Sequence, residues 1–284
     1  MDQAMSRRTF GRILAAGAIT TGLTAGTAAA ATSTDWMAAL PDAISLARLS
    51  IPGSHGSATR SGGPAVANQD LTIADQLTAG VRFLDTRCRL IENVFAMHHG
   101  AYYQGLMFGD VLNQCAAFLQ THPRETILMR VKQEYSTASD SAFGAVFANY
   151  QRQYPTLFHI GADVPSLGTA RGKVVVIADN GGVPGIRWNS LDIADDYDIA
   201  TIFDLYSRKW PGVQRHLDSA RQSGGGLFVT FTSSWGWGLW PRDAANAIAP
   251  KVAGYLGGFT KAMVGVVPMD FVNPTKAAQV FRLN

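Results

Sequence analysis

The chain has 284 residues, of which 47% are hydrophobic, and its formal net charge is +3. A chain of this length buries a full core, and roughly 250 residues is the common size of a single barrel domain. The small net charge and the lack of a dense Lys/Arg run argue against a nucleic-acid partner.

The first residues have the pattern of an export signal. Residues 6–10 (SRRTF) form a twin-arginine pattern, and residues 13–31 are apolar, rich in small residues and uncharged. The alanines at 28–31 offer the A-x-A site that signal peptidase needs. We predict a signal peptide at 1–31 and a secreted (extracellular) mature chain at 32–284, whose net charge would be +1. A retained membrane anchor is the alternative, although the run is barely long enough for a span.

Short apolar runs alternate with amphipathic ones along the rest of the chain. The apolar runs are rich in Val, Ile, Leu and Phe, as in buried strands. They predict strands at residues 46–51, 81–90, 94–98, 126–134, 173–178, 227–232 and 262–269. Helical spacing of apolar residues predicts helices at residues 73–78, 110–120, 142–150, 213–221 and 244–256.

This alternation of strands and helices predicts a parallel sheet, and seven or eight strands with right-handed crossovers favour closure. We therefore predict an α/β fold, a single distorted TIM (β/α) barrel with mostly parallel strands. An open, doubly wound sheet is the alternative. It would require a glycine-rich phosphate loop after the first strand, and residues 53–56 (GSHG) do not form one.

The chain contains two cysteines, Cys88 and Cys115. Their spacing does not fit a metal site, and two residues cannot form a disulfide framework. One disulfide and two buried thiols both fit the sequence.

Charged and polar residues gather where the predicted strands end. They are His55, Asp85, Arg87, His98, His99, Lys132, Glu134 and Asp270. Barrel enzymes build their active sites at the carboxyl ends of the strands. A closed barrel also places the last strand beside the first, so we expect Asp270 to lie close to His55.

Two histidines, an aspartate and an arginine suit the cleavage of a phosphodiester. Histidines titrate near neutral pH and can share the base and acid roles. An aspartate can orient one imidazole, and an arginine offers two parallel donors to phosphate. Each residue alone could equally be a structural partner, and Asp85–Arg87 or Lys132–Glu134 could be ion pairs at the barrel mouth. Their gathering on five strands favours a site.

The chain resembles bacterial phosphatidylinositol-specific phospholipase C, of the metal-independent type with a PI-PLC X domain. The matching stretches run in family order over nearly the whole mature chain. They are residues 49–55 (LSIPGSH), 82–87 (RFLDTR), 98–100 (HHG), 123–128 (PRETIL), 132–135 (KQEY), 170–173 (ARGK) and 264–265 leading to Asp270.

The resemblance implies cleavage of phosphatidylinositol to diacylglycerol and a 1,2-cyclic inositol phosphate. His55 would be the general base on the inositol 2-hydroxyl, with Asp270 orienting it. Arg87 would stabilise the pentacoordinate phosphate, and His99 would protonate the leaving oxygen.

The resemblance also implies a binding site for the inositol ring. Lys132, Asp204 and Tyr206 match positions that bind it. Two positions depart from the relatives, which carry an aspartate in place of Gly56 and an arginine in place of Asp179. We expect Asp179 to accept hydrogen bonds from ring hydroxyls.

Calcium-dependent relatives use carboxylates or Asn at the metal positions, which here hold Gly56, Asp85, Arg87 and Lys132. A guanidinium and an ammonium at these positions would repel Ca²⁺, which prefers several oxygen ligands. We therefore expect no metal and no cofactor.

Residues 233–240 (SSWGWGLW) contain Trp235, Trp237 and Trp240, three of the six tryptophans. Indole side chains favour the membrane interface. We predict a rim that makes transient contact with membranes or micelles of phosphatidylinositol; the alternative is a loop that packs over the barrel mouth. No feature signals oligomerisation, and we expect a monomer.

Two other functions fit less well. A glycerophosphodiester phosphodiesterase would need a His-Arg-Gly opening and paired metal carboxylates. A non-catalytic inositol-lipid-binding barrel is the second alternative, and Gly56 and Asp179 are the residues that favour it.

Overall fold

The computed structural model describes residues 33–284, so the predicted signal peptide lies outside the described residues. Within them, no helix has the length and apolar character of a membrane span. The strands are β1 (Ser50–Ser54), β2 (Phe83–Ile91), β3 (Val94–His99), β4 (Tyr102–Met107), β5 (Ile127–Gln133), β6 (Phe158–His159), β7 (Val174–Asp179), β8 (Ile186–Arg187), β9 (Asp192–Ala194), β10 (Phe228–Thr230) and β11 (Gly265–Met269). The α-helices are α1 (Ile73–Thr78), α2 (Phe108–Thr121), α3 (Asp140–Gln153), α4 (Leu167–Ala170), α5 (Ile202–Asp204), α6 (Trp210–Gln222), α7 (Pro241–Gly257) and α8 (Pro274–Phe281).

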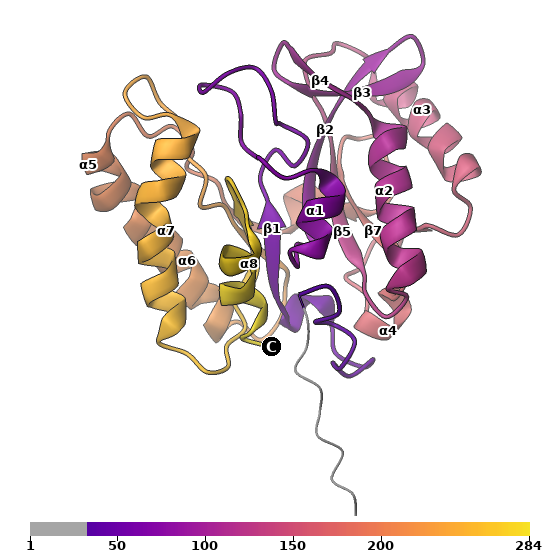
Figure 1. Ribbon diagram of the computed structural model, residues 1–284. Coiled ribbons are helices and arrows are strands. Elements are labelled where there is room, and N and C mark those ends of the chain that lie inside the picture. Colours follow the sequence, from indigo (N-terminus) through magenta and orange to yellow (C-terminus); the bar gives the residue numbers. More distant parts are fainter. Residues whose placement is uncertain (1–32) are drawn as a thin grey trace, which may run out of the picture. The chain divides into compact units, whose positions relative to one another are not determined.

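The strands form one sheet with the order β6-β7-β5-β2-β1-β11-β10-β9. Every pair along this path is parallel. The predicted α/β barrel is therefore confirmed, and the first strand pairs with the last from Ser50 opposite Gly265 to Ser54 opposite Met269. Figure 1 shows α6, α7 and α8 on one side of β1, and α1 to α4 on the other. In the described residues the strand path ends at β6 and β9, so pairing does not close this barrel.

Two predicted strands differ from the structure. Leu46–Arg48 form a short 3-10 turn, and the strand begins only at Ser50. The run predicted at 94–98 is a strand, but β3 runs antiparallel to β2 and pairs on its other side with β4. Glu92 and Asn93 make the tight turn between β2 and β3 with positive φ angles of 46° and 64°. A short apolar run does not reveal strand direction, which is why the sequence pattern missed this hairpin.

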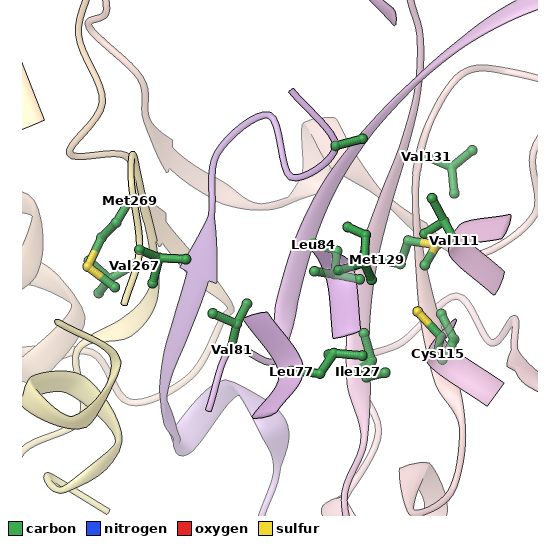
Figure 2. Close-up of a cluster of buried hydrophobic side chains, with 14 of the residues drawn as sticks. Leu77, Val81, Leu84, Val111, Cys115, Ile127, Met129, Val131, Val267 and Met269 are labelled. Carbon is green, nitrogen blue, oxygen red and sulfur yellow. The ribbon is translucent and has the colours of Figure 1, made fainter. Parts of the chain in front are cut away.

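Side chains of the central strands alternate between two cores, as the period of a strand requires. Phe83 and Leu128 belong to a core that fills the barrel. Leu84 and Met129, the next residue on each strand, belong to a second core that the outer helices cover. Figure 2 shows that second core, with Leu84 and Met129 of the sheet near Val111 and Cys115 of α2.

Both cysteines lie in this outer core as free, buried thiols. Burial raises the pKa of each thiol, that of Cys115 to about 12. Of the two arrangements that the sequence allowed, the structure therefore has two buried thiols and no disulfide between Cys88 and Cys115.

The amino-terminal ends of the strands are closed by residues that precede β1. The Trp36 Nε1 donates to the Gly80 carbonyl at 2.9 Å, and its ring stacks on Phe281. The backbone N–H of Met37 donates to Glu125 Oε1 at 2.9 Å. Glu125 also forms a fully buried ion pair with Arg82 at 2.8 Å.

Candidate active site

Charged side chains continue the inward-facing series toward the carboxyl ends of the strands. On β2, Asp85 and Arg87 follow Phe83 at steps of two, and on β5 Arg130 and Lys132 follow Leu128. Arg87, Arg130 and Lys132 border a cavity of about 490 Å³, and Asp85 is buried behind them. Residues that line the cavity include His55, Arg87, His99, Arg130, Lys132, Glu134, Asp195, Tyr197 and Trp235.

His55 lies directly after β1 and is held between an anion and a cation. Its Nδ1 lies 2.7 Å from Asp270 Oδ1, and its Nε2 lies 2.8 Å from Arg87 Nη2. A carboxylate can only accept and a guanidinium can only donate, so the neutral ring carries its proton on Nδ1. Nε2 is left with a free electron pair, the form that a general base requires. The predicted contact between Asp270 and His55 is confirmed.

Arg87 is held by two carboxylates. Its Nε and Nη2 lie 3.3 and 3.2 Å from Asp85 Oδ2, and its Nη1 lies 4.0 Å from Glu134. Burial acts to lower the pKa of Arg87, but Asp85 and Glu134 raise it above its ordinary value. The guanidinium is therefore permanently charged at the wall of the cavity, where it can bind a phosphate.

His99 reaches the cavity from the hairpin rather than from a barrel strand. Because β3 runs antiparallel to β2, the end of β3 that carries His99 lies near Arg87. Its Nδ1 donates to the Val66 carbonyl at 2.9 Å, so the neutral ring has its free electron pair on Nε2. Burial, with Arg87 and His55 adding to it, lowers the pKa of His99 to about 4.

Gly56 has a left-handed backbone with φ of 48°. A Cβ at this position would lie 2.7 Å from Asn68 Oδ1. Its N–H donates to Asp85 Oδ2 at 2.9 Å. A side chain at this position would therefore require Asn68 to move, whereas glycine adopts this backbone conformation without strain.

Lys132 and Asp179 lie where the strand ends place them, but they face different partners. Lys132 lines the cavity and pairs with Glu134 at 3.4 Å. Asp179 accepts from Arg130 at 2.6 and 2.9 Å and is not among the cavity-lining residues. The predicted hydrogen bonds of Asp179 to a ring would therefore have to compete with this ion pair.

Asp204 and Tyr206 are not brought to the cavity, which corrects their placement in the ring-binding site. Asp204 accepts from Thr201 Oγ1 at 2.7 Å in the first turn of α5, and Tyr206 lies under the Lys251 ammonium. The cavity is lined instead by Asp195 and Tyr197, which have the same Asp-x-Tyr spacing. This earlier pair, which lies nine residues before the predicted one, was not among the predicted site residues.

Besides Asp195 and Tyr197, Arg130 is a cavity residue that sequence reasoning missed. It lies two residues before Lys132 on β5, and this period of two is the signal that could have found it. Its guanidinium bonds to both Asp85 and Asp179 and stacks 3.9 Å over the Trp188 ring.

The three tryptophans of residues 233–240 are exposed, although Ser233, Ser234 and Leu239 of the same loop are buried. The exposed fractions of Trp235, Trp237 and Trp240 are 36%, 93% and 47%, and Trp235 also lines the cavity. A loop packed down over the barrel mouth would bury these rings, so their exposure supports the predicted rim.

In residues 33–284, no three His, Cys, Asp or Glu side chains are grouped as a metal site would need. The oxygens of Asp85 already accept from the Gly56 N–H, from Arg87 and from Arg130. A set of donors with two guanidinium groups is a poor match for Ca²⁺. That the protein needs no metal stays a prediction.

Comparison with known proteins gives consistent relatives. Residues 47–179 match the family model described as phosphatidylinositol-specific phospholipase C, X domain. The chain is 26% identical to the 1-phosphatidylinositol phosphodiesterase of Listeria monocytogenes, with 89% of this chain and 86% of that one covered. It is 28% identical to the Staphylococcus aureus protein of the same name, with 85% and 89% covered.

Solved structures agree with these relatives. The phosphatidylinositol-specific phospholipase C from Listeria monocytogenes superposes with a TM-score of 0.80 at 25% identity, over 89% of this chain and 99% of that one. A Staphylococcus aureus structure studied for membrane binding gives a TM-score of 0.79 at 26% identity, over 89% and 98%. The distorted barrel is thus common to this chain and to both solved proteins.

Proposed function

The chain is an enzyme of the phosphatidylinositol-specific phospholipase C family, and on this premise we propose that it cleaves phosphatidylinositol to diacylglycerol and a 1,2-cyclic inositol phosphate without a metal. The observation that carries the proposal is the ordered contact Asp270–His55–Arg87 on the cavity wall. It holds a base and a phosphate-binding cation side by side.

His55 is the proposed base. Its Nε2 accepts the proton of the inositol 2-hydroxyl as the 2-oxygen forms its bond to phosphorus. Asp270 Oδ1, 2.7 Å from Nδ1, stabilises the imidazolium that results. In the free protein Arg87 donates to Nε2, so substrate binding must turn this donor from the histidine to the phosphate.

Arg87 and His99 are the proposed electrostatic stabiliser and general acid. Arg87 donates to the phosphoryl oxygens, whose negative charge grows as the phosphorane forms. The negative charge of the bound phosphate favours protonation of His99 at Nε2. The protonated His99 then gives this proton to the diacylglycerol oxygen as the bond from that oxygen to phosphorus breaks. Each proton transfer contributes roughly 10²–10⁴-fold.

For the inositol ring we propose Lys132, Asp195 and Tyr197 as binding residues. Lys132 and Asp195 supply a donor and an acceptor for the hydroxyls, and all three line the cavity. Tyr197 is 57% exposed, so its ring is open to contact with an apolar sugar face.

The test is ³¹P NMR of the purified mature chain with phosphatidylinositol in detergent micelles and EGTA. We expect an early cyclic phosphodiester signal, its loss in His55→Ala, and its retention in His159→Ala, a histidine away from the cavity. Turnover that depends on added calcium would overturn the metal-free mechanism. Binding without turnover under both conditions would favour a non-catalytic inositol-lipid-binding protein.

We also propose that the chain is exported. The support is the twin-arginine pattern of residues 6–10 and the apolar residues 13–31. Amino-terminal sequencing of protein recovered from culture medium should begin near Thr32. Recovery of the full-length chain in the membrane fraction would favour the anchor instead.

A further inference from the structure

Arg130 connects two carboxylates that do not contact each other. Its Nη1 donates to Asp85 Oδ1 at 3.1 Å, while its Nε and Nη2 donate to Asp179 Oδ2 at 2.9 and 2.6 Å. Trp188 covers one face of the guanidinium. With a side-chain exposure of only 7%, the group is held on three sides.

Asp85 is the link between Arg130 and Arg87. Its carboxylate is fully buried, and the two guanidinium groups bind different oxygens. Oδ2 accepts from Arg87 and from the Gly56 N–H, while Oδ1 accepts from Arg130. Without Arg130, Oδ1 would be a buried anionic oxygen with no donor, which is costly unless the carboxylate turns.

From this geometry we propose that Arg130 is a positioning residue, which fixes the rotation of the Asp85 carboxylate and thereby aims Arg87 at the phosphate. Asp179 anchors Arg130 at the other end of the same series. This inference rests on the proposed function, in which Arg87 stabilises the phosphorane.

The series predicts graded effects along its length. Arg130→Met leaves Oδ1 unpaired and should lower kcat more than it raises KM, by about 10–100-fold, the scale seen when a group that orients an active-site ligand is lost. Arg130→Lys can reach only one of the two carboxylates and should lie between Arg130→Met and the unsubstituted protein. Asp179→Asn removes only the outer anchor and should cost least.

The deciding experiment is a double-mutant cycle of Arg130→Met with Arg87→Lys, assayed on phosphatidylinositol micelles. If Arg130 acts through Arg87, the double variant is about as active as Arg87→Lys alone. Multiplying losses would mean that Arg130 contacts substrate independently, and a fully active Arg130→Met would also overturn the inference.

Two measurements separate this inference from the proposed function. Arg187→Met removes another arginine at the strand ends, which within residues 33–284 bonds to the carbonyls of Val183 and Asn180, and should leave kcat unchanged. The NMR signal of the Arg87 Nε–H should move in Arg130→Met, whether or not the protein turns over phosphatidylinositol. An inactive parent protein would contradict the proposed function, whereas an unmoved Arg87 signal would contradict the inference.

Discussion

Arg82 directly precedes β2, at the amino-terminal end of the barrel (its base), and Arg87 lies midway along β2, at the cavity end of the barrel (its mouth). Both pair with buried carboxylates, but their surroundings differ. At the base, Arg82 bonds to Glu125 and to the carbonyls of Thr34, Leu77 and Val81, with no exposed side-chain surface. At the mouth, Arg87 bonds to Asp85 and His55 and retains 13% exposure at the cavity. At the base of the barrel the guanidinium is fully paired with protein groups, whereas at the mouth Arg87 can still donate to a ligand.

The pKa directions at the two ends differ in the same way. Burial lowers the pKa of Arg82 and raises that of Glu125, so the loss of hydration outweighs their attraction. Burial also acts to raise the pKa of Asp85, but Arg87 and Arg130 lower it well below its usual range. The two guanidinium groups around Asp85 therefore keep its carboxylate negatively charged. The comparison indicates that the base stabilises the fold, whereas the mouth keeps charged groups available for a ligand.

Arg82→Met should therefore destabilise the protein without changing its chemistry. It leaves Glu125 buried without its cation, and breaking a buried pair from one side costs about 3–5 kcal/mol. We expect a loss of that size in the free energy of unfolding, measured in urea. The kcat of the folded fraction should stay unchanged.

The double variant Arg82→Met/Glu125→Leu is the matched control. It removes both charges, so it should recover much of the stability that Arg82→Met alone loses. A double variant that is less stable than Arg82→Met would contradict this expectation. It would show that Arg82 and Glu125 stabilise the base of the barrel in other ways than by neutralising each other.

Arg87→Lys should give the opposite result. The ammonium keeps the positive charge beside Asp85 but cannot offer two parallel donors to a phosphate. We expect kcat to fall by about 10²–10³-fold, the usual cost of losing one preorganised donor. The melting temperature should change little. An Arg87→Lys protein that unfolds readily and keeps its kcat would erase the distinction between the two ends.

The pKa of His99 gives a direct test of the positive electrostatic potential at the mouth of the barrel, with a smaller expected effect. Its pKa, lowered to about 4 by burial, Arg87 and His55, makes it neutral at pH 7. A bound phosphate should raise this pKa by neutralising Arg87, because nearby negative charge favours the imidazolium. NMR titration with and without an inositol phosphate measures both values. A pKa that stays near 4 in the complex would overturn the role of His99 as general acid.

The same shift makes a stability prediction. In the unfolded chain His99 titrates near 6.5, above its folded value, so the unfolded state binds this proton first as the pH falls. The protein should lose stability between about pH 6.5 and pH 4. His99→Gln should lose less stability over that range, as urea unfolding at each pH would show.

Most of this site could be predicted because the period of two along a strand and the order of the strands can both be read directly from the sequence. His55 and Asp270 follow predicted strands and Arg87 lies late in one, and a barrel brings the carboxyl ends of its strands together. Arg130 was missed because its role depends on contacts with Asp85 and Asp179 on the two neighbouring strands. The register of these strands cannot be read from the pattern of a single segment.

Other differences have the same origin. The choice between the Asp-x-Tyr pairs at 195–197 and 204–206 depends on where the chain turns into α5. The direction of β3 depends on a two-residue turn with positive φ angles, which its apolar pattern does not encode. Chain order predicted that the last strand lies beside the first, but the other neighbours across the sheet could not be predicted from this sequence.

Trp36 and Trp237 extend the comparison of base and mouth to the apolar surface. Trp36 closes the base with 3% of its surface exposed, whereas Trp237 stands beyond the mouth with 93% exposed. A fully exposed indole contributes nothing to the core, so Trp237→Ala should leave the free energy of unfolding unchanged.

If the rim enters lipid, the loss of this ring should weaken binding to phosphatidylinositol vesicles by about tenfold, equivalent to about 1.4 kcal/mol. Hydrolysis of the water-soluble cyclic inositol phosphate by the same variant is the control, because that substrate needs no membrane contact. Unchanged vesicle binding in Trp237→Ala and Trp235→Ala would contradict the rim, while equal losses on both substrates would show that the loop shapes the cavity rather than binding the membrane.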